Sequence, residues 1–304
     1  MVPAEGVRER TGERSVPFLR AVRPAQWTKN LFVLAPLLFG KAATEAGPAA
    51  RTIGAAVAFC GVASALYLLN DVRDLEADRA HPVKRHRPIA SGALSTGAAL
   101  AASGVLLSVS LLLAVLAAPG ALPWILLYAA VTALYSFGLK AIALFDVFVI
   151  AAGFVLRVLA GSAAAGVSAS HWLLLCTFFL ALFLALSKRR GELTLHGVNG
   201  RVSLRDVPVS LVESLENVAL GTTVVCYALY TVAPETVAWF GTDGLLVTVP
   251  IVVFGMFRWR LLETRGGGED TAADLLTDSG LLATIVVWAS ACAAVIYWFP
   301  AGAR

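Results

Sequence analysis

The stretch LYLLNDVRDLEADRAHPVKRHRPIASG, residues 66–92, decides how the rest of the chain is interpreted. It begins as the end of an apolar run and then carries four acids, followed by a cluster of bases. The acids are Asp71, Asp74, Glu76 and Asp78. Such a concentration of charge directly after an apolar helix needs an explanation, and the explanation depends on the kind of protein that contains it.

The composition predicts an integral membrane protein. The chain has 304 residues, of which 58% are hydrophobic and 14% charged, with a mean hydropathy of +0.78. A soluble domain carries roughly a quarter charged residues. The apolar runs are continuous rather than alternating, which favours membrane-spanning helices over a β-barrel. The expected fold class is therefore all-α.

The apolar runs predict a bundle of about nine transmembrane helices in one domain, residues 22–304. No cleavable signal peptide is visible in the polar start of the chain, so we expect residues 1–21 to be a disordered cytoplasmic tail. The expected spans are 24–42, 52–69, 95–117, 122–138, 143–163, 170–187, 217–234, 243–258 and 280–299.

The distribution of charge predicts the orientation. With the N-terminus in the cytoplasm, the cytoplasmic segments hold 20 of the 24 lysines and arginines. The opposite side holds Lys41, Arg51 and Arg304. This bias follows the positive-inside rule for a cell-membrane protein. The same segments also hold 16 of the 20 acids, which the rule does not require. We therefore expect the functional cavity to open to the cytoplasm.

The acids are spaced as on one helical face. Asn70, Asp74 and Asp78 follow one another at intervals of four, and Asp71 joins the last two at i, i+3 and i+7. Carboxylates this close need a cation between them, and oxygen ligands suit Mg²⁺ that is bound together with substrate phosphates. We expect Asn70, Asp71, Asp74 and Asp78 to be catalytic, with the three aspartates as metal ligands. The alternative is an ordinary solvated loop that is salt-bridged with itself.

The bases that follow have the chemistry to bind phosphate. Lys84, Arg85 and Arg87 come a few residues after the last aspartate, and guanidinium and ammonium groups hold phosphate oxygens that a metal does not reach. The whole stretch therefore predicts a site for a Mg²⁺–pyrophosphate group.

The motif NDVRDLEAD with the following HPVKRHRPI resembles the first Asp-rich motif of the UbiA superfamily of intramembrane prenyltransferases. RPAQWTKN (23–30) resembles the first helix of that family, and YSFGLK (135–140) its Tyr–Lys motif. The resemblance covers nearly the whole chain and implies a UbiA-like fold. It also implies that Tyr135 and Lys140, which alone would suggest an interfacial anchor pair, bind substrate.

Within the superfamily, the chain most resembles the branch that transfers phosphoribose to a polyprenyl phosphate for a cell-wall arabinan precursor. GFVLRVLAG and SKRRGEL also resemble that branch. Most of the superfamily carries a second motif, D-x-x-x-D, where this chain has SKRRGELTLHG (187–197). Replacing carboxylates by cations suits a donor with an additional phosphate and argues against a prenyl diphosphate donor.

Three further groups are candidates for substrate binding. Arg157 lies inside an apolar run, and intramembrane charge usually faces a cavity or a partner; we expect it to contact phosphate or Asp146. Lys29, at the first span, either binds substrate or extends to the headgroups. Lys188, Arg189 and Glu192 are expected to form the second wall of the pocket. In the run 263–280, the acids Glu269, Asp270, Asp274 and Asp278 favour a helix cap and charge compensation over a second metal site.

These observations predict an enzyme that transfers 5-phosphoribose from phosphoribosyl pyrophosphate to a polyprenyl (decaprenyl) phosphate, with Mg²⁺ as cofactor. A prenyltransferase acting on an aromatic, quinone or haem acceptor is the alternative. A transporter is disfavoured because polar residues gather on one face. We expect membrane lipid but no nucleic acid as a partner, and the sequence leaves open whether the chain forms a homo-oligomer.

Overall fold

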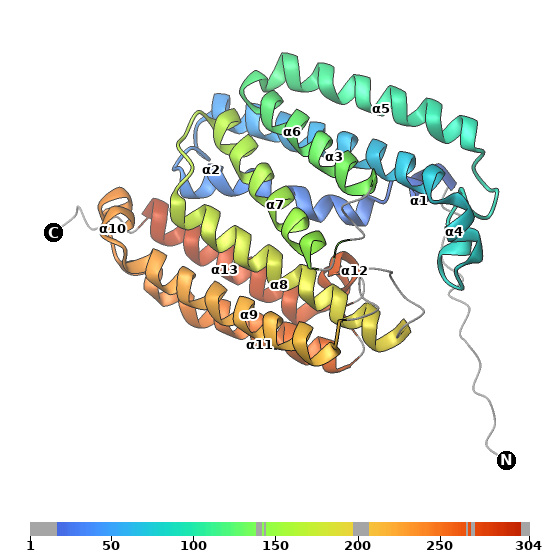
Figure 1. Ribbon diagram of the computed structural model, residues 1–304. Coiled ribbons are helices and arrows are strands. Elements are labelled where there is room, and N and C mark those ends of the chain that lie inside the picture. Colours follow the sequence, from blue (N-terminus) through green and yellow to red (C-terminus); the bar gives the residue numbers. More distant parts are fainter. Residues whose placement is uncertain are drawn as a thin grey trace.

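The computed structural model describes residues 17–137, 142, 144–196, 207–265, 267–268 and 271–298, and all regular structure within them is helical. Eight helical segments in these residues are long and apolar enough to cross a membrane. They correspond to eight of the nine expected spans, and the ribbon shows them as a bundle of roughly parallel rods (Figure 1).

The helices follow one another in a regular up-and-down order. The longer ones are α3 (Ala46–Arg73), α5 (Thr96–Ala117), α6 (Leu122–Phe137), α7 (Phe145–Ala165), α8 (His171–His196), α9 (Val209–Val232), α11 (Val249–Thr264) and α13 (Ser279–Trp298). The shorter ones are α1 (Pro17–Ala21), η1 (Pro24–Leu34), α2 (Ala35–Phe39), α4 (Leu75–Ala80), η2 (Lys84–His86), η3 (Pro119–Ala121), α10 (Pro234–Phe240), η7 (Gly244–Thr248) and α12 (Thr271–Thr277). Helix α1 lies within the segment expected to be a tail, of which residues 1–16 lie outside the described part.

The ninth expected span, 24–42, is helical in two pieces rather than one. Residues Pro24–Leu34 form the 3₁₀ helix η1, and the short α-helix α2 continues to Phe39. A 3₁₀ helix of this length is uncommon. It packs closely against α7, where an ideal Cβ on Gly161 would lie 1.9 Å from the carbonyl oxygen of Val33. Glycine at this position therefore lets the η1 backbone approach α7, as small residues do between membrane helices.

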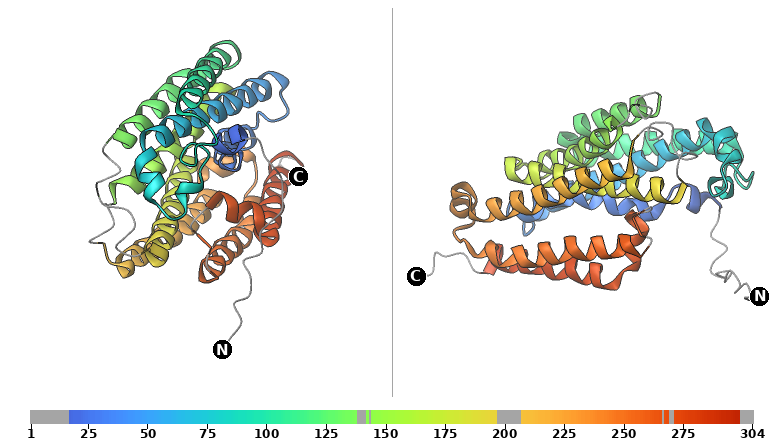
Figure 2. Two further views of the ribbon diagram at one scale, coloured as in Figure 1. Left: turned by 90° about the vertical axis from the view of Figure 1, so that its right-hand side faces the viewer. Right: turned by 60° about the horizontal axis from the view of Figure 1, so that its bottom comes forward.

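Helix α7 is the central element of the bundle, because it has the largest buried share of the eight spans. It contributes to a core with α3 and α6, and through Val147 to a second core with α8, α9, α11 and α13. Figure 2 shows α11 and α13 as a separate layer beside the other helices. The two cores share α7, so side chains on this helix are placed where both halves of the bundle meet.

The alternating order gathers the polar connections at two ends. One end carries α4, η2, α12 and the last turns of α8 and α11, whereas the other carries α10, α2 and the segment between α7 and α8 (Figures 1 and 2). We call these the α4 end and the α10 end. The Asp-rich segment lies at the α4 end.

Candidate active site

Two of the predicted aspartates converge at the end of α3. Asp71 lies in the last turn of α3 and Asp78 lies on α4, and their exposed fractions are only 2% and 4%. Helix α3 ends at Arg73, and α4 begins after a break at Asp74. The backbone nonetheless continues with the helical hydrogen bond from Asp78 N to Asp74 O, 2.8 Å. The two buried carboxylates therefore remain on one side of the turn.

A single guanidinium group joins these two carboxylates. Nη1 of Arg87 lies 3.1 Å from Oδ1 of Asp71 and 2.7 Å from Oδ2 of Asp78. Oxygens from both side chains are thus directed at one positively charged atom. That arrangement suits a divalent cation held by two carboxylates plus substrate phosphates, which is how Mg²⁺ commonly binds in proteins. The residues present therefore fit the metal that the sequence predicts.

Arg23 completes the cluster and was missed by sequence reasoning. Its Nη2 donates to both carboxylate oxygens of Asp71, at 2.5 and 2.7 Å, and its guanidinium lies 5.0 Å from the ring centre of Tyr67. Arg23 precedes η1 with a positive φ of 54°. Two carboxylates and two guanidinium groups give the cluster a formal charge of zero. The available signal was an arginine that opens the RPAQWTKN segment, 48 positions away from Asp71.

The other predicted residues of this segment lie around the cluster rather than inside it. Asp74 is half-buried, with the neighbouring Arg73 at 3.5 Å. Asn70 is half-buried in the last turn of α3. Lys84 and Arg85 are exposed on η2, where Arg85 donates to His86. No group of three or more His, Cys, Asp or Glu side chains with metal-binding geometry occurs within the described ranges.

Arg157 is buried at the centre of the bundle, with 4% of its surface exposed. It donates to Oδ1 of Asn30 at 2.7 Å, to the carbonyl oxygen of Gly153 at 2.8 Å and to the hydroxyl of Tyr128 at 3.0 Å. Its guanidinium also lies 4.5 Å from the ring centre of Tyr128. These partners are all uncharged, so in the described part of the chain the positive charge is not matched by a carboxylate contact. Asp146, the expected alternative partner, pairs with a different arginine.

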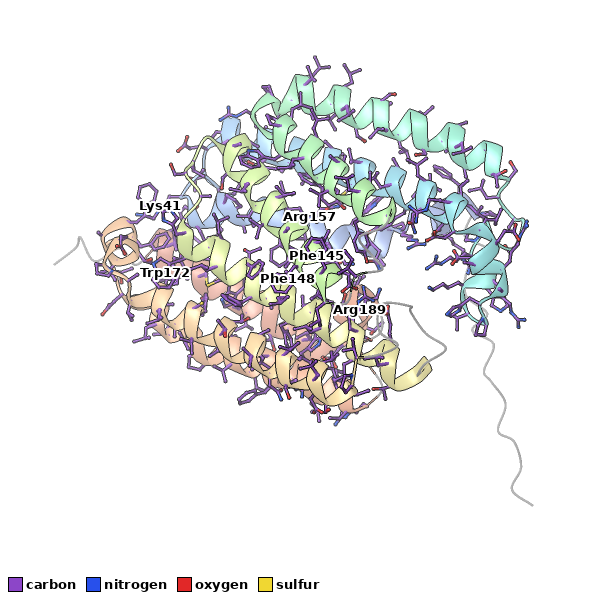
Figure 3. The ribbon with its side chains drawn as sticks, viewed as in Figure 1. Lys41, Phe145, Phe148, Arg157, Trp172 and Arg189 are labelled. Carbon is purple, nitrogen blue, oxygen red and sulfur yellow. The ribbon has the colours of Figure 1, made fainter. Side chains whose placement is uncertain are left out.

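That arginine is Arg189, near the end of α8 (Figure 3). Its Nε lies 2.7 Å from Oδ2 of Asp146, in the first turn of α7, and its Nη1 donates to Glu192. Arg189 and Glu192 therefore contact one another, and Lys188 beside them is half-buried. That these three side chains form the second wall of a pocket stays a prediction. Lys29 and Tyr135 are half-buried on η1 and near the end of α6. Lys140 lies outside the described residues.

A second charged group, which sequence reasoning also missed, crosslinks three helices at the α4 end. Arg190 of α8 pairs with Glu216 of α9 at 2.9 Å and with Glu263 of α11 at 2.7 Å. Arg260 of α11 lies 2.8 Å from each of the same two glutamates. We call these four residues the ionic quartet. Its only sequence signal is charge inside otherwise apolar runs, because the partners lie far apart in the chain.

The acidic run before α13 acts as a cap in the part that the structure describes. Asp278 accepts from the backbone N–H of Leu281 at 2.6 Å and pairs with Arg258 at 2.6 and 2.8 Å. Its pKa lies below the usual value for an aspartate, chiefly because Arg258 donates to it. Asp274 accepts from the backbone N–H of Gly268 at 2.6 Å. Glu269 and Asp270 lie outside the described residues.

The fold and these clusters define a multi-span helical membrane protein with an acidic and basic site at one end of its bundle. The model of the UbiA prenyltransferase family matches residues 33–280. The chain belongs to this family, which confirms the predicted resemblance and the all-helical fold.

Known relatives and solved structures agree with this assignment. A decaprenyl-phosphate phosphoribosyltransferase of Mycolicibacterium smegmatis is 34% identical over 92% of this chain and 92% of its own length. One of Corynebacterium glutamicum is 35% identical, over 93% of this chain and 87% of the relative. The structure of a UbiA homolog from Archaeoglobus fulgidus bound to GPP and Mg²⁺ shares the fold, with a TM-score of 0.71, 18% identity, and coverage of 92% of this chain and 99% of that one.

Proposed function

We propose that this chain transfers the 5-phosphoribosyl group of phosphoribosyl pyrophosphate to decaprenyl phosphate, or to a similar polyprenyl phosphate, and releases pyrophosphate. Support comes from relatives of that name that match almost the full length of the chain. The structural observation that carries the proposal is the pair of buried carboxylates, Asp71 and Asp78, directed at one nitrogen of Arg87.

The reaction needs positioning and charge stabilisation more than a strong base. The bond between C1 of the ribose and the pyrophosphate oxygen breaks, and an oxygen of the lipid phosphate forms the new bond to C1. A phosphate monoester loses its second proton with a pKa of about 6, so this nucleophile is already ionised near neutral pH. The departing pyrophosphate takes the electron pair of the broken bond and has to be stabilised as an anion.

Asp71 and Asp78 would hold Mg²⁺, and the bound ion would neutralise charge on the pyrophosphate. In the structure, Arg23 and Arg87 occupy the same carboxylates. We propose that these arginines neutralise the aspartates and that, with Mg²⁺ held by the carboxylates, their guanidinium groups would bind phosphate oxygens. Guanidinium groups suit both partners because carboxylate and phosphate accept the same forked pair of N–H donors.

A donor that carries a 5-phosphate requires further cations. Arg157 is proposed to contact a phosphate, because its buried charge has uncharged partners in the described part of the chain. Lys188 and Arg189 are proposed as the second wall, where most of the superfamily has carboxylates. Lys29, Lys84, Arg85, Tyr135, Lys140 and Glu192 remain proposed substrate-binding residues, with Asn70 and Asp74 as proposed supporting residues of the catalytic segment.

We propose that the site lies at the cytoplasmic face of the cell membrane. This orientation rests on the excess of lysine and arginine in the segments assigned to that side. A phosphorylated sugar donor is made and kept in the cytoplasm, whereas the polyprenyl tail stays in the bilayer, so both substrates meet at the membrane boundary. The product would serve as a precursor of cell-wall arabinan.

An assay with purified protein tests the proposal directly. Labelled phosphoribosyl pyrophosphate and decaprenyl phosphate are offered with Mg²⁺, and transfer to lipid and pyrophosphate release are measured. Asp71→Asn and Asp78→Asn should each reduce turnover at least about a hundredfold, as loss of a main electrostatic group does. Glu76→Gln is the matched control, because Glu76 is an exposed acid of the same segment, and it should retain near wild-type turnover.

The family also supports a second candidate function, prenyl transfer from a prenyl diphosphate to an aromatic acceptor. A neighbour of the same fold was solved with GPP and Mg²⁺. Offering prenyl diphosphate with an aromatic acceptor to the same preparation separates the two functions. Product from that pair, with none from phosphoribosyl pyrophosphate, would replace the first proposal by the second.

A further inference from the structure

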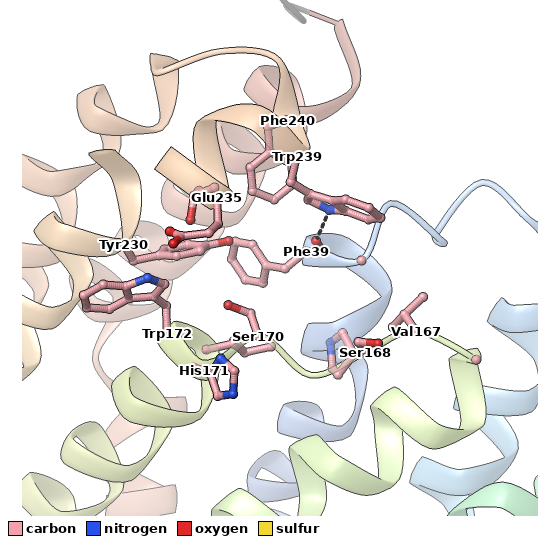
Figure 4. A pocket seen from close by; sticks show the side chains of 15 residues that line it. Phe39, Val167, Ser168, Ser170, His171, Trp172, Tyr230, Glu235, Trp239 and Phe240 are labelled. Atoms are coloured by element: carbon pink, nitrogen blue, oxygen red, sulfur yellow. Dashed lines mark hydrogen bonds between the residues drawn. The ribbon is translucent and has the colours of Figure 1, made fainter. Parts of the chain in front are cut away.

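A cavity of about 610 Å³ lies at the α10 end, away from the proposed active site. The end of α2, the segment between α7 and α8, and the adjoining parts of α9 and α10 form its walls (Figure 4). His171, at the start of α8, lines it, whereas Arg189 lies eighteen residues further along the same helix. At 1.5 Å per residue the two positions are about 27 Å apart. The volume falls in the range of small-molecule and cofactor sites.

Five of the fifteen residues that line the cavity are phenylalanine, tyrosine or tryptophan. They are Phe39, Trp172, Tyr230, Trp239 and Phe240. The rings of Phe39 and Tyr230 meet edge to face, 5.9 Å apart at 78°. The indole N–H of Trp239 donates to the carbonyl oxygen of Phe39 at 3.2 Å, which fixes that ring against α2. The wall is therefore preformed, and the negative faces of such rings attract organic cations.

Polar groups in this wall have no partner among the residues that the structure describes. Tyr230 is only 5% exposed, and its ring reaches from α9 toward Phe39 (Figure 4), yet its hydroxyl makes no hydrogen bond to another described residue. The indole N–H of Trp172, which is half-buried, likewise has no hydrogen-bond partner among the described residues. A buried tyrosine usually places its hydroxyl on a partner. Two such atoms at one cavity indicate a polar ligand.

The acidic and basic side chains lie at different parts of the cavity. Glu235 is the one carboxylate among the described lining residues, and no lysine or arginine is among them. Two cations lie at the rim instead. Nζ of Lys41 donates to the carbonyl oxygen of Trp239 at 2.6 Å. Arg51 donates to the carbonyl oxygen of Ala164 at 2.9 Å, and one of its nitrogens lies 3.9 Å from the position of a Cβ on Gly166.

We propose that this cavity binds the headgroup of a zwitterionic phospholipid. The ammonium group lies against Glu235 and the rings of Trp172 and Tyr230, because Trp239 and Phe240 already face the ammonium of Lys41 at 5.8 and 5.6 Å. The phosphate lies at the rim with Lys41 and Arg51. Polyprenyl phosphate does not fit, because a phosphate without an ammonium group would meet Glu235 and the negative ring faces inside. A lipid is favoured over a soluble amine because exposed apolar side chains, among them Leu229, Val232 and Trp239, flank the cavity.

The proposal is tested by native mass spectrometry of the full chain in detergent, titrated with defined lipids. Phosphatidylethanolamine should bind at least about fivefold more tightly than phosphatidylglycerol, which has the same phosphate but no ammonium group. Glu235→Gln should weaken phosphatidylethanolamine binding by about fivefold. Asp243→Asn is the matched control: Asp243 is an exposed acid at the same end that does not line the cavity, and its loss should leave binding within about twofold.

Two further measurements make the result decisive. Tyr230→Phe removes only the hydroxyl and should also weaken binding of the ethanolamine lipid, while an unchanged melting temperature shows that the variant is folded. Free ethanolamine should not displace the lipid. Equal binding of the two lipids, an unaffected Glu235→Gln variant, or displacement by free ethanolamine would each overturn the proposal. None of these readouts depends on transferase activity.

Discussion

At the α4 end, the buried carboxylates of Asp71 and Asp78 are neutralised by Arg23 and Arg87 at N–O distances of 2.5 to 3.1 Å. Asp71 and Asp78 were predictable because helical spacing places them on one side and because this charged segment directly follows an apolar run. Arg23 was not predictable in this role, since its contact with Asp71 spans 48 positions. The long-range partner of a buried carboxylate depends on how helices pack, which spacing along one helix does not reveal.

At the residue scale, Arg87 is expected to stabilise the fold, because it contacts two buried carboxylates. Replacement by glutamine leaves Asp78 without its arginine partner and Asp71 with Arg23 alone. This should lower the free energy of unfolding by about 1–3 kcal/mol, the penalty for one unpaired buried charge. Thermal unfolding in detergent measures the effect. Mg²⁺ should restore more of the lost stability in Arg87→Gln than it adds to the wild type.

Arg85→Gln is the control for this prediction, because Arg85 is an exposed arginine two positions earlier and contacts neither aspartate. It should unfold at nearly the wild-type temperature with or without Mg²⁺. If Arg87→Gln and Arg85→Gln behave alike, Arg87 does not neutralise the aspartates in solution.

At the scale of the element, continuous apolar runs predicted eight spans, but some ends were wrong by about two helical turns. The span expected at 170–187 continues in α8 to His196, and the span expected at 217–234 begins in α9 at Val209. Such an apolar run predicts a membrane helix from its own residues, because a membrane helix forms its backbone hydrogen bonds within itself. The first span differs because its conformation is set by a neighbour. The close approach of η1 to Gly161 of α7 is a tertiary contact, and a sequence pattern in either segment alone does not predict a 3₁₀ helix.

Gly161→Ala tests this contact. The added Cβ would lie 1.9 Å from the carbonyl oxygen of Val33, which is backbone and cannot move aside without shifting η1. We expect a loss of about 1–3 kcal/mol, as for overpacking in a core, measured by thermal unfolding. Gly104→Ala, in α5, is the control, because a Cβ there meets nothing within 4 Å. Equal melting temperatures for the two variants would contradict the packing described here.

The ionic quartet is expected to hold α8, α9 and α11 together. Glu216→Gln removes the carboxylate that lies 2.9 Å from Arg190 and 2.8 Å from Arg260, at a cost of about 3 kcal/mol for a broken buried pair. Glu213→Gln provides the comparison: Glu213 lies on the same helix, is half-exposed, and is 3.6 Å from Arg260. That change should alter stability by less than about 1 kcal/mol. A Glu213→Gln effect as large as that of Glu216→Gln would argue against a structural role for the quartet.

At the scale of the whole molecule, composition alone placed the chain in the membrane, and alternation of the spans gathers the charged segments at one end. The predicted orientation can be tested in intact cells with a membrane-impermeant thiol reagent, after the four native cysteines are replaced. Asp243→Cys at the α10 end should be labelled, whereas Ser91→Cys at the α4 end should be labelled only after the cells are opened. The reverse pattern would place the proposed site on the outer face.

The ionic quartet also has a consequence for how the chain enters the bilayer during synthesis. Arg190 arrives first with α8, Glu216 follows with α9, and Arg260 and Glu263 arrive together with α11. The sum of these formal charges is therefore plus one after α8, zero after α9 and zero after α11. Helix α9 brings the opposite charge to the arginine of α8, and α11 brings one charge of each sign. The partly inserted bundle therefore never holds more than one of these charges without an opposite charge.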